Sequence, residues 1–276
     1  MEEALKQFRI DNKVALITGG AGLLGIQHAE AIAEAGGIPV LWDIDVTNAE
    51  EYVSEISKQW KVPCRAMEVD ITSGDTIKDG LNKTLSDFGR VDILINNAAN
   101  DPKVDNASEH EWSRFENFSI EMWHQDISVG LTGAFLCSQI VGTHMAKSGG
   151  GVILNIASDL SIIAPDQRIY QKEGLSEELQ PVKPVTYSVV KHGLIGLTRY
   201  LATYWAKAGV RVNAISPGGV YTNQPEDFVA RLTNLIPMGR MAKKDEYKAA
   251  IIFLVSDASY YMTGTNLVID GGRTCW

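Results

Sequence analysis

The chain has 276 residues, 45% of them hydrophobic, and its 34 acidic residues outnumber 25 basic ones to give a formal net charge of -9. Length and apolar content suffice for one α/β domain with a full core, and the lack of a Lys/Arg block argues against nucleic-acid binding. The start is unlike a signal peptide and no apolar run reaches the ~18 residues of a membrane span, so we expect a cytoplasmic protein.

Short β-branched runs alternate with segments of helical period. The expected order is strand 14–17, helix 23–35, strand 38–42, helix 49–59, strand 66–69 and helix 76–88, then strands 91–95, 152–156, 210–215 and 266–269 with helical stretches between them. Near-continuous apolar strands followed by helices predict a parallel sheet covered on both faces. The fold class is therefore α/β, a Rossmann-type doubly wound sheet of about seven strands in a single domain.

A glycine-rich turn, TGGAGLLG at residues 18–25, follows the first strand and leads directly into a helix. Such a turn lets backbone approach a pyrophosphate closely, and the helix N-terminus offers N–H groups and partial positive charge. Its position inside a βαβ unit strengthens the prediction. The cofactor-binding residues expected here are Gly19, Gly22, Leu24 and Gly25.

Asp43 ends the second strand, where a carboxylate can accept hydrogen bonds from the adenosine ribose and would repel a 2′-phosphate. Neither Gly20 nor Ile44 is a basic residue that could welcome that phosphate. NAD is therefore favoured over NADP, with Asp45 as the competing acid.

Two stretches interrupt the α/β rhythm, residues 101–116 and residues 165–184, and we call them the mouth segments. Both follow strands, at the carboxyl edge where open α/β sheets bind ligands. The second is polar, with Arg168, Gln171, Lys172 and Glu173, which suits a polar substrate. The alternative is that both are tolerated surface loops.

Tyr187 and Lys191 open a predicted helix at i and i+4, so that phenol and ammonium share one helical face. A free tyrosine with a pKa of ~10 is a poor base at neutral pH, but a neighbouring cation favours its phenolate. The pair is therefore a candidate for proton transfer, although YxxxK alone is common by chance.

Together these motifs resemble the short-chain dehydrogenases/reductases. The likeness runs from about residue 10 to residue 272. The segments that carry it in family order are TGGAGLLG, Asp43, Asp70-Ile71, Asn96-Asn97-Ala98, Asn155-Ile156-Ala157-Ser158, Tyr187 with Lys191, Asn213 to Gly218 and Gly264 to Gly272.

The resemblance implies a role for each matching position. Ser158 would hold the substrate oxygen, Tyr187 would exchange its proton, and Lys191 would bind the nicotinamide ribose and lower the tyrosine pKa. The resemblance further implies adenosine contacts from Asp70, Ile71, Asn97 and Ala98, nicotinamide contacts from Pro217, Gly218 and Val220, and a homotetramer. Ser161 is the rival of Ser158, and no metal is expected, because His28, His192 and the three scattered cysteines lack ligand spacing.

Three departures from the family pattern stand out. The glycine spacing is TGxxGxxG, with Leu23 at the expected middle glycine, which looks like the nucleotide-sugar-modifying branch. Gly130 replaces the helix-four asparagine that supports a proton-relay water, which puts that relay in doubt. The separation between Ser158 and Tyr187 is longer than in typical members. Together with TGGAGLLG, this longer separation makes the chain resemble the flagellin-modification oxidoreductases.

The expected function is an NAD-dependent oxidoreductase that moves a hydride between nicotinamide and a carbonyl or secondary alcohol of a polar small molecule such as a sugar. One alternative is a nucleotide-sugar epimerase or dehydratase, suggested by the glycine spacing. A noncatalytic NAD-binding sensor or scaffold is the other, suggested by Gly130.

Overall fold

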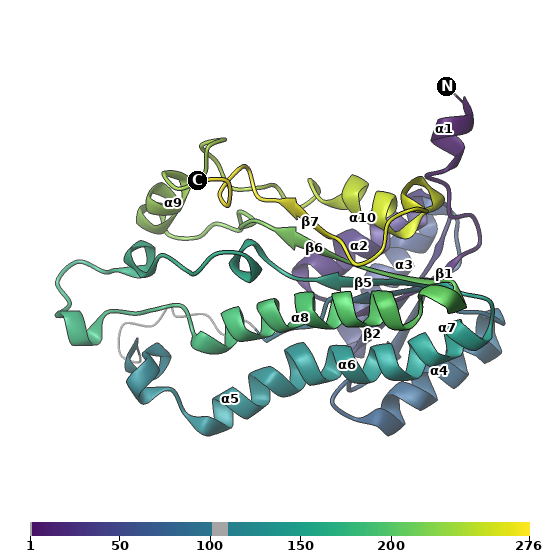
Figure 1. Ribbon diagram of the computed structural model, residues 1–276, viewed down its shortest axis with the longest axis horizontal. Coiled ribbons are helices and arrows are strands. Elements are labelled where there is room, and N and C mark those ends of the chain that lie inside the picture. The colour runs from purple at the N-terminus through teal and green to yellow at the C-terminus, as the bar shows by residue number, and fades with distance from the viewer. Residues whose placement is uncertain (1, 101–109) are drawn as a thin grey trace.

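The computed structural model describes residues 2–100 and 110–276. Its sheet has seven parallel strands in the order β3-β2-β1-β4-β5-β6-β7 (Figure 1). The strands are β1 (Val14–Thr18), β2 (Ile38–Asp43), β3 (Arg65–Glu68), β4 (Ile93–Asn96), β5 (Gly151–Ile156), β6 (Val210–Pro217) and β7 (Asn266–Ile269). The expected doubly wound α/β sheet is thus confirmed.

Helices cover both faces of the sheet. The described ones are α1 (Glu2–Lys6), α2 (Leu23–Glu34), α3 (Val46–Trp60), α4 (Gly74–Phe88), α5 (Ile120–Ile127), α6 (Gly133–Cys137), α7 (Thr143–Lys147), α8 (Val185–Tyr204), α9 (Glu226–Thr233) and α10 (Lys248–Val255). Over residues 2–100 and 110–276, none is both long enough and apolar enough to cross a membrane.

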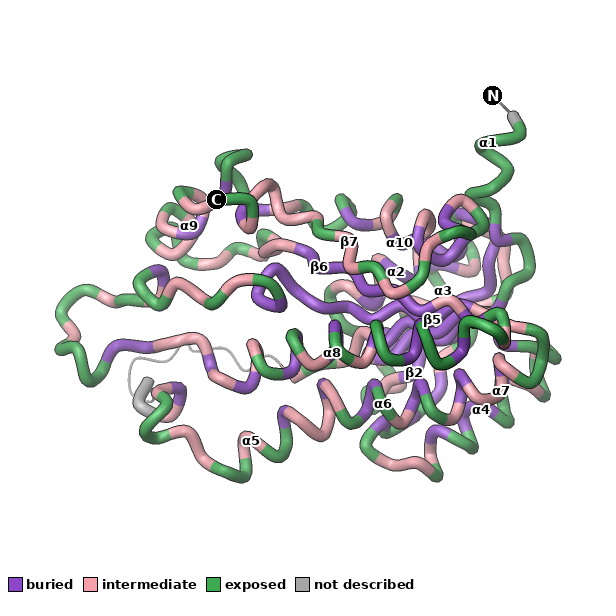
Figure 2. The backbone as a smooth tube through the Cα atoms, viewed as in Figure 1, coloured by how far each residue is buried: buried purple, intermediate pink, exposed green. Residues whose placement is uncertain are grey.

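Neighbouring residues on each strand point to opposite faces and bury two separate cores. Val14 and Leu16 of β1 belong to the cluster beneath α4, α6 and α8, whereas Ala15 and Ile17 belong to the cluster beneath α2, α3 and α10. Burial on both faces explains why the strands read as continuous apolar runs. Figure 2 shows the buried tube concentrated in the sheet and the exposed tube on the outer sides of the helices.

Two helices begin earlier than their apolar period indicates, because capping residues precede them. The Asp45 carboxylate accepts a hydrogen bond from the backbone N–H of Asn48, and the Ser73 hydroxyl accepts one from that of Thr76. These bonds satisfy N–H groups of the first turn. α3 and α4 therefore start at Val46 and Gly74, a few residues before the expected 49 and 76.

Helices α5, α6 and α7 form one continuous rod (Figure 1), joined by π-helical turns at Ser128–Thr132 and Ser138–Gly142. A Cβ on Gly130 in the first of these turns would lie 2.6 Å from Cγ1 of Val190 on α8. Real Cβ atoms do not approach so closely, so glycine at this position lets the rod pack against the helix that carries Tyr187 and Lys191.

Candidate active site

The glycine-rich turn between β1 and α2 leaves no room for a side chain at Gly19, Gly20 or Gly25. Gly19 has a φ of +60°, and a Cβ on Gly25 would lie 2.2 Å from the carbonyl oxygen of Gly19. Gly22 is the N-cap of α2 and has no side-chain cap, and Leu24 follows it, half-buried. A bare backbone turn at a helix N-terminus fits the pyrophosphate of a dinucleotide.

Asp43 lies at the end of β2 beside this turn. One carboxylate oxygen accepts a hydrogen bond from the N–H of Ala21 at 2.9 Å, and the other accepts one from that of Asp45 at 3.1 Å. Each carboxylate oxygen can accept more than one such bond, so both keep capacity for ribose hydroxyls. The competitor Asp45 is occupied as the N-cap of α3.

Asn97 ties the loop after β4 to the glycine-rich turn. Its side-chain amide donates to the carbonyls of Thr18 and Gly19, both at 3.0 Å, and the backbone N–H groups of Asn97 and Ala98 donate to the Thr18 hydroxyl. The Asn97 side chain is therefore a clamp on the turn, a structural task that the sequence pattern does not reveal. Ala98 lies under Gly19, whose Cβ would approach its Cα to 2.9 Å.

Asp70 and Ile71 follow β3. The carboxylate of Asp70 accepts hydrogen bonds from the backbone N–H and the hydroxyl of Thr72, and it stays exposed. The Ile71 side chain is buried in the core, where it packs against Gly133 of α6. The buried side chain leaves only the backbone of Ile71 for the predicted contact with adenine.

Ser158 follows β5 and is 5% exposed. Its hydroxyl donates to the carboxylate of Asp159 at 2.8 Å and accepts from the N–H of Leu160 at 3.2 Å. The rival Ser161 shares a hydrogen bond with Ser216, which in turn donates to Asn266, so its hydroxyl belongs to a buried strand-to-strand network. Between the two serines, Ser158 is the better candidate for the substrate oxygen.

Lys191 links the helix of Tyr187 to the strand of Ser158. Its ammonium is buried and donates to the carbonyl of Ile156 at 2.8 Å, two residues before Ser158. It lies 5.7 Å from the centre of the Tyr187 ring, and the ammonium of Lys183 lies over the same ring at 3.8 Å. Two cations flank the phenol, and the sequence pattern anticipated only Lys191.

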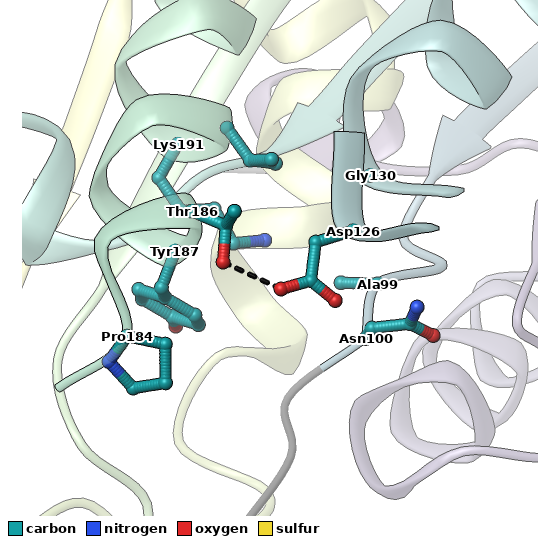
Figure 3. Close-up of a pocket in the computed structure, with 9 residues that line it drawn as sticks. Ala99, Asn100, Asp126, Gly130, Pro184, Thr186, Tyr187 and Lys191 are labelled. Atoms are coloured by element: carbon teal, nitrogen blue, oxygen red, sulfur yellow. Dashed lines mark hydrogen bonds between the residues drawn. The ribbon is translucent and has the colours of Figure 1, made fainter. Parts of the chain in front are cut away.

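A small pocket opens beside Tyr187 and Lys191, and its walls include Asp126, Gly130 and Thr186 (Figure 3). Asp126 is buried and accepts a hydrogen bond from the Thr186 hydroxyl at 2.5 Å. The cavity measures about 10 Å³, the space of one water molecule. Where the family pattern has an asparagine, this chain therefore has a glycine beside a one-water cavity and a buried carboxylate.

The loop after β6 is rigidly held. The N–H of Gly218, which follows Pro217, donates to the carbonyl of Ile269, and the carbonyl of Gly218 accepts from the phenol of Tyr247 at 2.9 Å. Burial raises the pKa of Tyr247, which keeps the phenol protonated as a donor. Val220 pairs with Ala242 in an isolated bridge. Tyr247 thus supports the predicted nicotinamide loop and was missed in the sequence, because no short motif contains it.

The described parts of the two mouth segments contact each other beyond Ser158 and Tyr187, and residues 101–109 lie outside the described residues. The guanidinium of Arg114 donates to the carbonyls of Glu177 and Gln180, and the N–H of Val182 donates to the Ser113 hydroxyl. Ile169 is buried against residues of α9, so the second segment also has an apolar side.

Charged groups of the second mouth segment remain accessible. The guanidinium of Arg168 pairs with Asp166 at 2.6 Å, yet the Arg168 side chain is 79% exposed.

No cluster of three or more His, Cys, Asp or Glu side chains suited to a metal ion occurs in residues 2–100 and 110–276. The chemistry the site offers is that of a dinucleotide-binding turn beside a serine, a tyrosine and a lysine.

Comparisons with known proteins agree with this geometry. A family model described as Enoyl-(Acyl carrier protein) reductase matches residues 21–274. The chain is 34% identical to a D-threitol dehydrogenase of Mycolicibacterium smegmatis, over 97% of this chain and 95% of the relative. It is also 34% identical to an NAD-dependent glycerol dehydrogenase of Listeria innocua, over 98% and 96% of the two chains.

A solved structure shares the fold over nearly the whole length. It is a gluconate 5-dehydrogenase from Burkholderia cenocepacia in complex with NADP and tartrate, with a TM-score of 0.86 and 28% identity over 99% of both chains. These similar proteins use different nicotinamide cofactors, so the likeness alone does not decide between NAD and NADP.

Proposed function

Because this chain belongs to the short-chain dehydrogenase/reductase family, we propose that it is an NAD-dependent dehydrogenase of a polyol, sugar or sugar acid, with Tyr187 as its acid/base. The observation that carries the proposal is the cluster of Ser158, Tyr187 and Lys191, joined through the bond from the Lys191 ammonium to the Ile156 carbonyl.

In the proposed mechanism, each of these side chains either transfers a proton or stabilises a charge. Bound NAD supplies the hydride acceptor for alcohol oxidation. Tyr187, as phenolate, takes the hydroxyl proton of the substrate, and the Ser158 hydroxyl donates a hydrogen bond to the same oxygen. The ammonium groups of Lys183 and Lys191 favour the phenolate, because opposite charge stabilises the ionised form. A water molecule in the cavity beside Asp126 and Lys191 would accept the proton from Tyr187 and carry it away from the substrate.

NAD is the proposed cofactor because of Asp43. Its carboxylate lies at the end of β2 beside the glycine-rich turn. The negative charge of this carboxylate would repel the 2′-phosphate of NADP. The N–H of Ala21 holds this carboxylate in place.

A polar substrate is supported by two observations. The mouth carries the exposed Arg168 and the ammonium of Lys183 next to Tyr187, both suited to hydroxyl or carboxylate groups. The similar proteins are named for threitol, glycerol and gluconate. Both mouth segments are proposed parts of this substrate site.

The test is a screen of NADH formation against polyols, aldoses, sugar acids and hydrophobic secondary alcohols. Tyr187→Phe should abolish turnover of any accepted substrate while NADH binding persists. Tyr261→Phe is the matched control, because the Tyr261 ring is exposed and lies on none of the helices proposed for subunit contact. Turnover by Tyr187→Phe at the native rate would contradict the assignment and would favour a noncatalytic NAD-binding role.

We also propose that the enzyme is a cytoplasmic homotetramer. Support comes from apolar surface on neighbouring helices, where Phe135 is 45% exposed and the stacked rings of Tyr200 and Tyr204 are 63% and 65% exposed. Light scattering should give four times the mass of one chain, and Tyr200→Glu combined with Tyr204→Glu should lower it.

A further inference from the structure

A buried ion pair stands directly beside Ser158. The guanidinium of Arg273, in the turn after β7, contacts the carboxylate of Asp159 at 2.7 Å, and the two side chains are 7% and 4% exposed. Two residues that are 114 positions apart in the sequence thus meet next to Ser158.

The carboxylate of Asp159 is fully engaged. One oxygen accepts from the Ser158 hydroxyl and from the N–H of Leu160, both at 2.8 Å, and the other accepts from Arg273. Because the Ser158 hydroxyl donates to this carboxylate, its rotamer is set by Asp159.

Folding alone gives little reason for this pair. A buried ion pair is often replaceable by apolar residues without loss of stability. The Nε of Arg273 is moreover buried with no hydrogen-bond partner within the described part of the chain, an unfavourable feature for a group that only stabilises. A role in the reaction accounts better for the arrangement.

The charge of Asp159 matters for the reaction at Tyr187 and the substrate oxygen. Oxidation of an alcohol at this site starts from the negative phenolate of Tyr187 and passes that one charge to the substrate oxygen as the proton moves the other way. The short 3₁₀ turn that contains Asp159 (Asp159–Ser161) packs against α8, which carries Tyr187. An unneutralised carboxylate there would raise the energy of both negative groups and would hold the Ser158 proton away from the substrate.

We propose that Asp159 and Arg273 form a positioning pair for Ser158. Asp159 orients the hydroxyl, and Arg273 neutralises Asp159 so that the hydroxyl can turn its proton toward the substrate oxygen as charge develops there. This inference rests on the proposed function, in which Ser158 and Tyr187 face the substrate oxygen.

The test compares the pKa of Tyr187 in two single variants, which should shift it in opposite directions, and in the double variant. Arg273→Met leaves a bare carboxylate and should raise the pKa of Tyr187 by roughly one unit, with kcat about 10- to 100-fold lower. Asp159→Asn removes the ion-pair partner of Arg273 and leaves its positive charge with only the electrostatic influence of Asp166, so it should lower that pKa. The double variant should return it to within about 0.3 units of the native value, because the two opposite charges are removed together.

The readout is the tyrosinate absorbance of the NAD-bound enzyme as a function of pH, with the Tyr187→Phe enzyme subtracted. It needs no substrate. Rates of NAD reduction with D-threitol supply the kcat comparison. The titration also senses Lys183, Lys191 and Asp126, which all variants retain.

Arg90→Met is the control, since it removes the Arg90–Asp92 pair just before β4, at the opposite edge of the parallel sheet from Ser158, which follows β5. It should leave the Tyr187 pKa unchanged. An unchanged pKa in Asp159→Asn, or a double variant shifted as far as a single one, would overturn the proposal. These two variants decide the matter even if Arg273→Met does not fold. Failure of every polyol, sugar and sugar acid as a substrate would instead count against the proposed function and not against the positioning pair, because the titration does not depend on turnover.

Discussion

Acid should weaken the fold through His28, a histidine of α2 that is 2% exposed. Burial penalises the charged ring and lowers the pKa of His28 to about 4, an effect that the nearby Asn97 side chain offsets in part. In the unfolded chain the pKa is ~6.5. Between these values the unfolded state binds a proton that the folded state excludes. His28 therefore contributes stability above about pH 6.5, and this contribution is lost as the pH falls toward about 4.

The full shift corresponds to ~3 kcal/mol, of which about 2 kcal/mol is lost between roughly pH 7 and pH 5. Denaturant unfolding at the two pH values measures it. From the higher to the lower pH, the free energy of unfolding of the native protein should fall by about 2 kcal/mol more than that of His28→Gln. His192→Gln, with its exposed ring on α8, should behave like the native protein. Equal losses in the native protein and in His28→Gln would refute the reasoning.

Three further outcomes concern the cofactor turn and the mouth. Asp43→Asn keeps an acceptor for the N–H of Ala21 but removes the charge, so the preference of kcat/KM for NAD over NADP should narrow by roughly 30- to 150-fold. Tyr247→Phe removes the bond to the Gly218 carbonyl and should raise the Kd for NADH about 5- to 10-fold, as fluorescence titration would show; an unchanged Kd would argue against a supporting role. Replacing residues 167–182 by a short Gly/Ser link should leave the Kd for NADH within a few-fold but raise the substrate KM, and an unchanged kcat/KM would mean that the segment is only a surface insertion.

The sheet was predictable from the sequence because strands that are buried on both faces consist of continuous apolar residues. Strand β7 was placed at its observed bounds, and β2 extended by one residue to Asp43. Helix starts were less well placed, since the caps Asp45 and Ser73 form local hydrogen bonds that the apolar period does not show.

The site was predictable only where a short motif carries it. Tyr187 and Lys191 share one helix, so their spacing alone brings them to one face. The partners Asp159 and Arg273 are brought together by the sheet order, and the stacking of Lys183 on the Tyr187 ring depends on the path of the mouth segment. Neither contact leaves a pattern in the sequence.

The position of β1 between β2 and β4 separates two sides of one sheet. Strands β2 and β3 extend on one side and bring Asp43 and Asp70, whereas β4 to β7 extend on the other and bring Ser158, Lys191 and the Gly218 loop. Under the proposed function, the residues that select the cofactor and those that bind the substrate therefore lie in separate stretches of the chain. We expect that exchanging the residues around β2 for those of an NADP-using relative would change the cofactor used and leave the proposed catalytic groups Ser158, Tyr187 and Lys191 unchanged.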